Sequence, residues 1–406
     1  MKTQSPLNVL VVGAGMYVCG RGTEGYGTIL PALYRARREN LAGSIKIAAT
    51  SARSIKALGE KIKGLDALFG FGMNPELYPN TGSDRHAYRK ALQGDGKPDC
   101  AIVSVPDHLH FEITADLIKR GIHCLVVKPL APVVFEVKEL IRLAEAGGVY
   151  GAVEFHKRYD RSNLKLKDVL RQGRIGKPLY FIVEYSQRKS IPLVMFRDWV
   201  RHTNILQYLG IHYIDIIYFA TGATPKRVLA MGQKEILLRQ GVDTFDAIQC
   251  LIEWEMGNSH RFTSAILTNW IDPEKTSAMS DQRIKVIGTE GRFEADQKYR
   301  GITIVTDAGG IEEPNPDFSS FYGTGAGEEL SFQGYGPESV LRFLEDVRSI
   351  KTKALKPADL EGKRPTFRDA LAPTAILEAA NRSLAEDGVW VDIEESCFVI
   401  PAKAGI

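Results

Sequence analysis

The sequence predicts an α/β fold with a doubly wound parallel sheet, followed by an α+β fold built on a large and mainly antiparallel sheet. Up to Phe155, short apolar stretches alternate with helix-like stretches, which is typical of β-α-β units. Beyond Phe155, several β-rich stretches follow one another at hairpin distances. The chain has 406 residues, more than one hydrophobic core usually holds, so we expect two domains.

The first region contains five apolar stretches of strand length, with amphipathic helical stretches between them. The predicted strands are Asn8–Val12, Ser44–Ala49, Cys100–Val105, His123–Val127 and Val149–Glu154. The predicted helices are Thr28–Asn40, Ser54–Gly64, His110–Arg120 and Val134–Ala146. Strands that are separated by helices in this way pair in parallel.

The second region is predicted to begin with a helix, Leu164–Gln172, and to hold a mainly antiparallel sheet crossed by a second helix, Ile205–Phe219. Its last part consists of an irregular loop, Asn315–Gly336, and helices at Pro337–Ser349 and Thr366–Ala385. The predicted strands are Leu179–Tyr185, Arg227–Met231, Ala247–Glu255, His260–Thr268, Arg283–Val286, Arg292–Asp296, Gly301–Val305 and Val389–Ile393.

Composition indicates an ordinary globular protein, with 44% hydrophobic residues, 25% charged residues and a net charge of +3. The charges are interspersed, so we expect no nucleic-acid partner. No apolar stretch reaches the roughly 20 residues that a membrane span needs, and the N-terminal apolar run reads as a strand rather than a signal peptide. Five scattered cysteines without a CxxC pair predict buried free thiols in a cytoplasmic protein. The histidines and cysteines lack the spacing of a metal site, so no metal is expected.

A glycine turn follows the first predicted strand. Gly13-x-Gly15 lets the backbone turn tightly and approach a pyrophosphate, so Gly13, Gly15, Met16 and Tyr17 are candidate cofactor contacts. Further glycines predict an enlarged phosphate loop, Gly13–Gly27, before a helix that begins near Thr28. The alternative is a structural turn that carries a surface loop.

The end of the second strand carries no carboxylate that would bind the 2′-hydroxyl of NAD. It carries Ser51 and Arg53, whose hydroxyl and guanidinium favour the 2′-phosphate of NADP over NAD. Arg53 is equally compatible with a solvated position at a helix start.

A lysine ends a buried strand later in the same region. Lys128 follows the apolar run Cys124–Val127, and Pro129 then stops the strand. Because the carboxyl ends of parallel strands border the ligand crevice, Lys128 is a candidate catalytic and cofactor-binding residue. A solvated lysine at a strand end is the alternative.

Together these residues resemble the family of glucose–fructose oxidoreductase, inositol dehydrogenase and rhizopine-catabolism oxidoreductases, over nearly the whole chain. The match to the family's strand-end pattern consists of Ser104, Pro106, His110 and Val127-Lys128-Pro129, with Val127 standing where the family has Glu. The resemblance implies cofactor contacts at Ser104, Pro106 and His110. It also implies a Rossmann domain, taken here as residues 1–150, and an α+β substrate-binding and oligomerisation domain with an open sheet, residues 151–406. We also allow for a C-terminal helix that packs back on the first domain.

A second match is the segment Tyr208–Asp215. The resemblance implies that His212 is the general base; Asp215 is retained, and Tyr208 replaces an earlier Asp of the family. Positions i, i+4 and i+7 place these three residues on one helical face, where they can form a proton relay. His212 is also compatible with a buried structural histidine. Asp215 is a candidate substrate contact and is equally compatible with a structural role.

Three further residues are candidate substrate contacts. His156 and Arg158 match the family's segment after the fifth strand, with His156 at the position of an asparagine. Trp199 precedes the substrate helix, where it can stack on a sugar ring. Each is equally compatible with packing.

The sequence therefore predicts an NAD(P)-dependent oxidoreductase that acts on a hydroxyl of a sugar, sugar derivative or cyclitol. Lys128 would steady the developing alkoxide, His212 would take the hydroxyl proton, and Tyr208 would bond the base or the substrate. Two alternatives stay open: a sugar-modifying enzyme that uses bound NAD transiently, and a non-catalytic nucleotide sensor. We expect a homodimer or homotetramer, because an exposed sheet face is commonly buried by a second copy.

Overall fold

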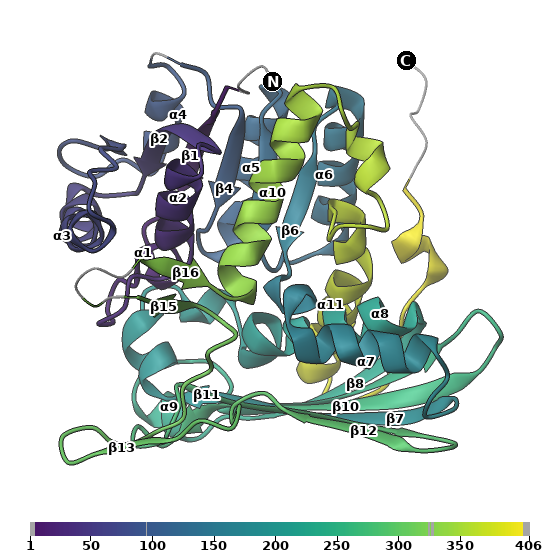
Figure 1. Cartoon of the computed structure of the whole chain (residues 1–406). Helices are drawn as coiled ribbons and strands as arrows, with labels where there is room; N and C mark the ends of the chain where they lie inside the picture. Colours follow the sequence, from purple (N-terminus) through teal and green to yellow (C-terminus); the bar gives the residue numbers. More distant parts are fainter. Residues whose placement is uncertain (1–4, 95, 324, 326–328, 401–406) are drawn as a thin grey trace. The chain divides into compact units, whose positions relative to one another are not determined.

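The computed structural model describes residues 5–94, 96–323, 325 and 329–400, which form two compact units (Figure 1). The first unit comprises Met1–Leu130, Val137–His156 and Asp317–Arg368; the second comprises Ala131–Glu136, Lys157–Pro316 and Asp369–Ile406. The division thus differs from a single boundary at residue 150. Residues Asp317–Arg368 belong to the first unit because their helix packs on the first sheet.

The first unit is built on a parallel sheet of six strands, in the order β3-β2-β1-β4-β5-β6. Five of these were predicted and β3 was not, because its three residues are too few for a periodic signal. The strand order reverses between β1 and β4, which makes their carboxyl ends a topological switch point. The strands are β1 (Leu7–Val12), β2 (Ala42–Ala48), β3 (Glu76–Tyr78), β4 (Cys100–Val103), β5 (His123–Val127) and β6 (Gly151–Glu154).

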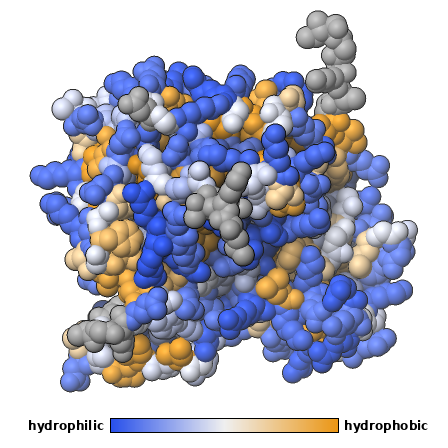
Figure 2. Space-filling view, turned by 45° about the horizontal axis from the view of Figure 1, so that its top comes forward, coloured by the Kyte–Doolittle hydropathy of each residue, from blue (hydrophilic) through white to orange (hydrophobic). Residues whose placement is uncertain are grey.

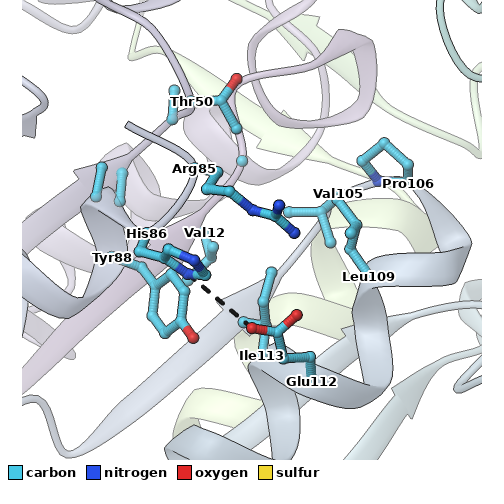
Figure 3. Close-up of a pocket in the computed structure, with 14 residues that line it drawn as sticks. Val12, Thr50, Arg85, His86, Tyr88, Val105, Pro106, Leu109, Glu112 and Ile113 are labelled. Atoms are coloured by element: carbon cyan, nitrogen blue, oxygen red, sulfur yellow. Dashed lines mark ion pairs between the residues drawn. The ribbon is translucent and has the colours of Figure 1, made fainter. Parts of the chain in front are cut away.

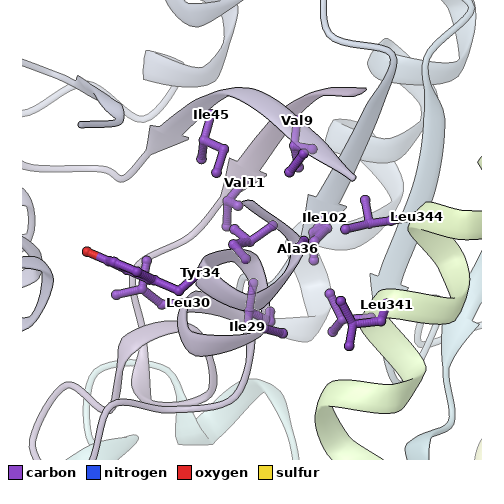
Figure 4. Close-up of a cluster of buried hydrophobic side chains, with 14 of the residues drawn as sticks. Val9, Val11, Ile29, Leu30, Tyr34, Ala36, Ile45, Ile102, Leu341 and Leu344 are labelled. Carbon is purple, nitrogen blue, oxygen red and sulfur yellow. The ribbon is translucent and has the colours of Figure 1, made fainter. Parts of the chain in front are cut away.

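Among the described residues, this unit holds seven α-helices. They are α1 (Met16–Cys19), α2 (Ile29–Arg38), α3 (Ala52–Phe69), α4 (Ala87–Ala91), α5 (His110–Lys119), α6 (Val134–Gly147) and α10 (Tyr335–Lys351). Helix α6 begins within the stretch Ala131–Glu136 that is assigned to the second unit. Helix α5 packs against β4 and β5, and α10 lies beside α2 in front of the sheet (Figure 1). Figure 4 shows the shared core, in which Leu341 and Leu344 of α10 join Ile29 of α2 and Val9 of β1. Their burial fixes α10 to the sheet through the hydrophobic effect.

The second unit is built on a mixed, mainly antiparallel sheet of seven strands, in the order β12-β11-β7-β10-β9-β8-β17. Only the β7–β10 pair is parallel. Strand β9 alternates buried and half-buried residues, the pattern of a sheet with one face on the core. The strands are β7 (Pro178–Arg188), β8 (Thr224–Gln233), β9 (Ala247–Glu255), β10 (Arg261–Asp272), β11 (Ser280–Gly288), β12 (Arg292–Asp296) and β17 (Val391–Asp392).

Helices α7 (Arg161–Arg171), α8 (Ile211–Thr221) and α11 (Leu371–Ala385) lie on one face of this sheet (Figure 1), and α9 (Ile236–Arg239) is a single turn. The predicted helix Ile205–Phe219 is not uniform: Leu206–Gly210 forms a π turn that leads into α8. A π turn holds more residues than a regular α-helical turn, and a sequence pattern based on 3.6 residues per turn does not predict it.

Two predicted segments differ from the structure because each contains part of a short hairpin whose two strands pair with each other. The strand predicted at Gly301–Val305 is β13 (Ile304–Thr306), which pairs only with β14 (Gly310–Glu312). Within the predicted loop Asn315–Gly336, β15 (Ser320–Tyr322) pairs with β16 (Ser331–Gln333). Neither hairpin joins a main sheet, so neither shows the alternating apolar pattern of a buried strand.

In the described part of the chain, no helix is long and apolar enough to cross a membrane. The face drawn in Figure 2 is mainly hydrophilic, with smaller apolar areas. All five cysteines are free thiols: Cys19, Cys100, Cys124 and Cys250 are buried, and Cys397 is half-buried.

Candidate active site

The glycine turn lies where β1 and β4 end side by side. Gly13 has a φ of +125°, and a Cβ atom there would lie 1.9 Å from the carbonyl oxygen of Ser104. The Gly13 amide donates to Ala48 O at 2.8 Å, and the Ser104 amide donates to Val12 O at 2.8 Å. Only glycine fits this position, because any side chain would push the ends of β1 and β4 apart. At Gly15, by contrast, no atom lies within 4 Å of an added Cβ.

The loop after the turn differs from the prediction of a phosphate loop that extends to Gly27. One helical turn, α1, follows Gly15 directly, and its end at Cys19 is followed by an excursion over residues 20–27. The amide of Thr28 then donates to Tyr17 O at 2.8 Å, which brings the start of α2 back beside α1. Lys61 of α3 donates to the carbonyls of Thr23 at 2.8 Å and Gly25 at 2.7 Å. Residues 20–27 therefore form a separate loop after α1, held by the hydrogen bonds from Lys61 of α3.

The end of β2 presents two hydroxyls and two guanidiniums. Ser51 caps α3 and accepts from the amide of Ser54 at 3.2 Å. Arg53 lies exposed in the first turn of α3, where it was expected to meet a phosphate. Arg21, from the inserted loop, donates to the hydroxyl of Ser54 at 2.8 Å. The sequence analysis missed Arg21, although its place between Gly20 and Gly22 put it in the glycine-rich loop.

A pocket opens beside the ends of β1, β2 and β4 (Figure 3). Pro106, a predicted cofactor contact, is among its lining residues, and so is Glu112, whose Oε1 lies 4.0 Å from Nδ1 of His86. Figure 3 shows the Arg85 side chain reaching toward Val105. A mostly apolar slot with a guanidinium beside it suits a flat aromatic ring. Its lining residues are Val12, Gly13, Ala48, Ala49, Thr50, Arg85, His86, Ala87, Tyr88, Val105, Pro106, Leu109, Glu112 and Ile113.

Lys128 follows the last residue of β5 and is only 6% exposed. Burial lowers the pKa of its ammonium to about 8, while the charges of Asp107 and Glu154 oppose that shift. A buried amine that titrates near neutral pH at the carboxyl edge of a parallel sheet is a candidate catalytic group.

His110 was expected to contact the cofactor, and in the structure both of its ring nitrogens lie beside backbone carbonyl oxygens. Its Nδ1 lies 2.6 Å from the carbonyl oxygen of Pro129, and its Nε2 lies 2.9 Å from that of Val105. The ring is 1% exposed, and burial lowers its pKa. His110 therefore ties the segment after Lys128 to the end of β4.

A buried carboxylate that the sequence analysis missed lies at the end of β6. Glu154 is 1% exposed and accepts from Tyr17 Oη at 2.7 Å and Ser339 Oγ at 2.6 Å. The Nδ1 atom of His156 lies 2.9 Å from its second carboxylate oxygen. His156, a predicted substrate contact, is 7% exposed and stacks against Tyr335 with ring centroids 5.6 Å apart. The signal for Glu154 was the same as for Lys128: one charged residue closing an apolar strand.

Tyr17 was also a predicted cofactor contact. Its hydroxyl points at Glu154, and burial together with that carboxylate raises its pKa well above the usual value. Tyr17 and Met16 both lie in α1, which follows the glycine turn directly.

In the second unit, His212 lies in the first turn of α8 and is 4% exposed. Its ring centroid lies 6.4 Å from that of Tyr185 on β7. Tyr208 lies in the preceding π turn, so the expected spacing of a regular helix does not apply between it and His212. Its ring packs against Phe196 at 4.7 Å and Trp270 at 5.8 Å. Trp199 joins the same aromatic group through Phe196, at 4.6 Å.

Arg158 and Asp215 were both predicted to contact substrate, and the structure pairs them with each other. Arg158 Nη2 donates to Asp215 Oδ1 at 2.6 Å, and its Nη1 donates to Asp369 at 2.8 Å. Burial raises the pKa of Asp215 to about 6, against the opposing charge of Arg158. Because Arg158 bonds both oxygens of Asp215, the pair holds α8 in place.

The parallel sheet with a glycine turn at its switch point defines a dinucleotide-binding unit of the oxidoreductase class. A profile of the oxidoreductase family with an NAD-binding Rossmann fold matches residues 7–155, and one of the GFO/IDH/MocA C-terminal domain matches residues 163–294. The chain belongs to the Gfo/Idh/MocA oxidoreductase family, which confirms the resemblance that the sequence motifs carried.

Relatives with named activities support this assignment. The chain is 25% identical over 255 residues to a 1,5-anhydro-D-fructose reductase of Ensifer adhaerens, covering 61% of this chain and 73% of that protein. It is 28% identical over 222 residues to a myo-inositol 2-dehydrogenase of Thermotoga maritima, covering 53% and 62% respectively. An inositol dehydrogenase homolog from Azotobacter vinelandii, solved with NADH and myo-inositol, shares the fold with a TM-score of 0.69 and 16% identity, covering 96% of this chain and 98% of that one.

Proposed function

We propose that the protein is an NAD(P)-dependent dehydrogenase or reductase acting on a CH–OH group of a sugar, sugar derivative or cyclitol. The observation that carries the proposal is Lys128, a buried amine at the carboxyl end of β5 in a sheet of the NAD-binding type. The names of the two relatives, an anhydro sugar reductase and an inositol dehydrogenase, support polyhydroxylated substrates.

The residues around the first sheet fit a nicotinamide dinucleotide. The tight turn at Gly13 leads to Gly15, where no atom lies within 4 Å of an added Cβ, and this open space suits the approach of a pyrophosphate. The mostly apolar pocket beside Arg85 and Pro106 is proposed to take the adenine ring. When bound, the nicotinamide supplies the hydride chemistry. We propose NADP over NAD, because Arg21 and Arg53 supply guanidiniums at the end of β2, where NAD-binding proteins present a carboxylate.

For catalysis, we propose that Lys128 stabilises the developing alkoxide as an ammonium and that His212 takes the hydroxyl proton. Tyr208 is proposed to hydrogen-bond the base or the substrate, and Trp199 to stack on a sugar ring. The Arg158–Asp215 pair is proposed to orient α8, which carries His212.

Association into a homodimer or homotetramer is proposed through the open face of the second sheet. Tyr180 and Ile182 of β7 and Leu267 of β10 are all exposed on strands that pair directly. The buried free thiols support a cytoplasmic location.

The test begins with calorimetric titration of the purified protein with NADPH and, separately, with NADH. A panel of sugars, anhydro sugars and inositols is then assayed for net change in nicotinamide absorbance. Tight NADPH binding with net turnover supports the proposal. Cofactor that stays bound, with sugar conversion but no net reduction, would favour the transient-NAD enzyme; binding without any conversion would favour a sensor.

A further inference from the structure

Three neighbouring strand ends of the first unit carry buried charges. Asp107 follows β4, Lys128 follows β5 and Glu154 ends β6; they are 3%, 6% and 1% exposed. In the parallel pairing of β5 with β6, Glu154 stands opposite Val127, one residue before Lys128. Lys128 thus lies directly after the middle strand. Glu154 ends one neighbouring strand, and Asp107 lies in the turn that follows the other strand, which ends at Val103.

The carboxylate of Glu154 is held by three donors from different parts of the unit. Tyr17 of α1 and Ser339 of α10 both donate to Oε1, and the ring of His156 lies against Oε2. These contacts replace the water that a buried carboxylate loses, so the charge is tolerated in the interior. They also fix the carboxylate relative to the helix that follows the glycine turn.

We propose that Glu154 is a positioning residue that keeps the buried Lys128 in its ammonium form and ties the helix after the glycine turn to β6. This inference rests on the proposed role of Lys128 and adds to it the group that maintains its charge. Without a neighbouring negative charge, a buried lysine loses its proton more readily and no longer stabilises an alkoxide.

Among the described residues, other titratable groups also lie near Lys128 and Glu154. Asp107 also favours the ammonium of Lys128, and the ring of His110 is close enough to interact with it electrostatically. Tyr335 of α10 stacks on His156 and interacts electrostatically with Tyr17. Glu154, in addition, accepts a hydrogen bond from Tyr17 of α1. Variants of Glu154 and Tyr17 therefore test the role of Glu154 while Asp107 stays in place.

The matched variant is Glu154→Gln, because the amide keeps the hydrogen bonds and removes only the charge. Its Oε1 still accepts from Tyr17 and Ser339, and its amide group donates to an unprotonated Nδ1 of His156. The variant should therefore fold. Glu154→Asp keeps the charge, and Tyr17→Phe removes one donor while the carboxylate stays.

The experiment measures the protonation of Lys128 without any turnover. The intact protein is treated with a small acylating reagent at pH 6 to 10, and the rate of Lys128 modification is followed by peptide mass spectrometry. In Glu154→Gln, the midpoint of this profile should move to a pH about 1 lower than in the wild type, with labelling at pH 7 about fivefold faster. Glu154→Asp should restore the wild-type midpoint, and Tyr17→Phe should leave it in place.

An unchanged midpoint in Glu154→Gln overturns the inference, as does an equal displacement in Tyr17→Phe. Labelling does not depend on substrate, so failure of the proposed oxidoreductase activity leaves this test intact. If the protein turns substrate over, the basic limb of the kcat profile should move with the labelling midpoint. A purely structural carboxylate would lower thermal stability without moving either profile.

Discussion

The added Cβ of any residue at position 13 would lie 1.9 Å from the carbonyl oxygen of Ser104, so β1 and β4 can end side by side only over a glycine. This contact is made at the switch point of the sheet, where a dinucleotide binds in proteins of this architecture. Gly13 is therefore required because the backbone after β1 lies so close to the backbone of Ser104 after β4.

Gly13→Ala is expected to abolish binding of NADPH and NADH and to lower the unfolding temperature. The reason is that both the clash and the positive φ of +125° oppose a side chain. Gly59→Ala in α3 is the matched control, since no atom lies within 4 Å of its added Cβ and the position is outside the glycine turn; it should keep cofactor binding. Calorimetric titration of both variants checks this, and full cofactor affinity in Gly13→Ala would contradict the proposed binding turn.

Cofactor choice is expected to depend on Arg21 as well as on Arg53. Arg21→Ala removes a guanidinium that lies at the hydroxyl of Ser54, and should weaken NADPH binding about tenfold or more while leaving NADH binding nearly unchanged. Arg37→Ala, which alters a guanidinium bound to the carbonyl of Gly43, serves as a control for lost surface charge. Equal losses for NADPH and NADH would show that Arg21 only supports the loop.

The fold was largely predictable because apolar periodicity marks strands and helices directly. The parallel sheet and the mixed sheet follow from such stretches as His123–Val127 and Ala247–Glu255. The π turn Leu206–Gly210 was not predictable. A C-terminal helix packed on the first domain was allowed for, but the sequence did not identify α10 as that helix. The turn departs from the regular helical period, and the packing depends on contacts between residues far apart in the sequence.

The sequence indicated candidate residues at the ends of strands, but it did not indicate which other side chains bond to them. Lys128 stands where the apolar run indicated, at the end of β5. The pairing of Arg158 with Asp215 joins residues 57 positions apart, and the Glu154 cluster joins residues from α1, β6 and α10. A local sequence pattern does not identify hydrogen-bond partners that are far apart in the chain. The mutual hydrogen bonds of Arg158 and Asp215, two predicted substrate contacts, were therefore not predicted.

Lys128→Met is expected to abolish turnover and at the same time stabilise the folded protein. The unfolded chain holds the lysine proton up to a pKa near 10.4, whereas the folded protein releases it near pH 8. Stability of the wild type therefore rises with pH between these values, and the charged lysine costs at most about 3 kcal/mol at pH 7. Denaturant unfolding should show a gain for Lys128→Met that shrinks to about 1 kcal/mol at pH 9.5. A loss of stability at pH 7 would contradict a buried, unfavourable charge.

Breaking the Arg158–Asp215 pair is expected to lower the stability of the folded protein more than it weakens substrate binding. Arg158→Met leaves Asp215 buried without its counter-charge and should cost about 3 kcal/mol or more, measured by denaturant unfolding at pH 7. Burial raises the pKa of Asp215 and Arg158 lowers it, so Asp215 should take up its proton at a higher pH in the variant than in the wild type, and the loss of stability should shrink as the pH falls. The double variant Arg158→Met/Asp215→Leu should recover most of it. A large rise in KM with unchanged stability would instead restore the substrate-binding role.

His212→Asn is expected to lower kcat by about 10² to 10⁴ while cofactor affinity and unfolding temperature stay near wild type. The substitution keeps a polar side chain in the first turn of α8, where His212 is 4% exposed, so packing against Tyr185 is largely retained. If His212 removes the hydroxyl proton, the loss should be greatest at neutral pH and should shrink as hydroxide replaces the base at high pH. Tyr208→Phe is the comparison: it keeps the ring packing against Phe196 and removes only the hydroxyl, so a smaller loss in kcat is expected. Wild-type turnover in His212→Asn would remove His212 from the mechanism and leave Lys128 as the proposed acid–base group.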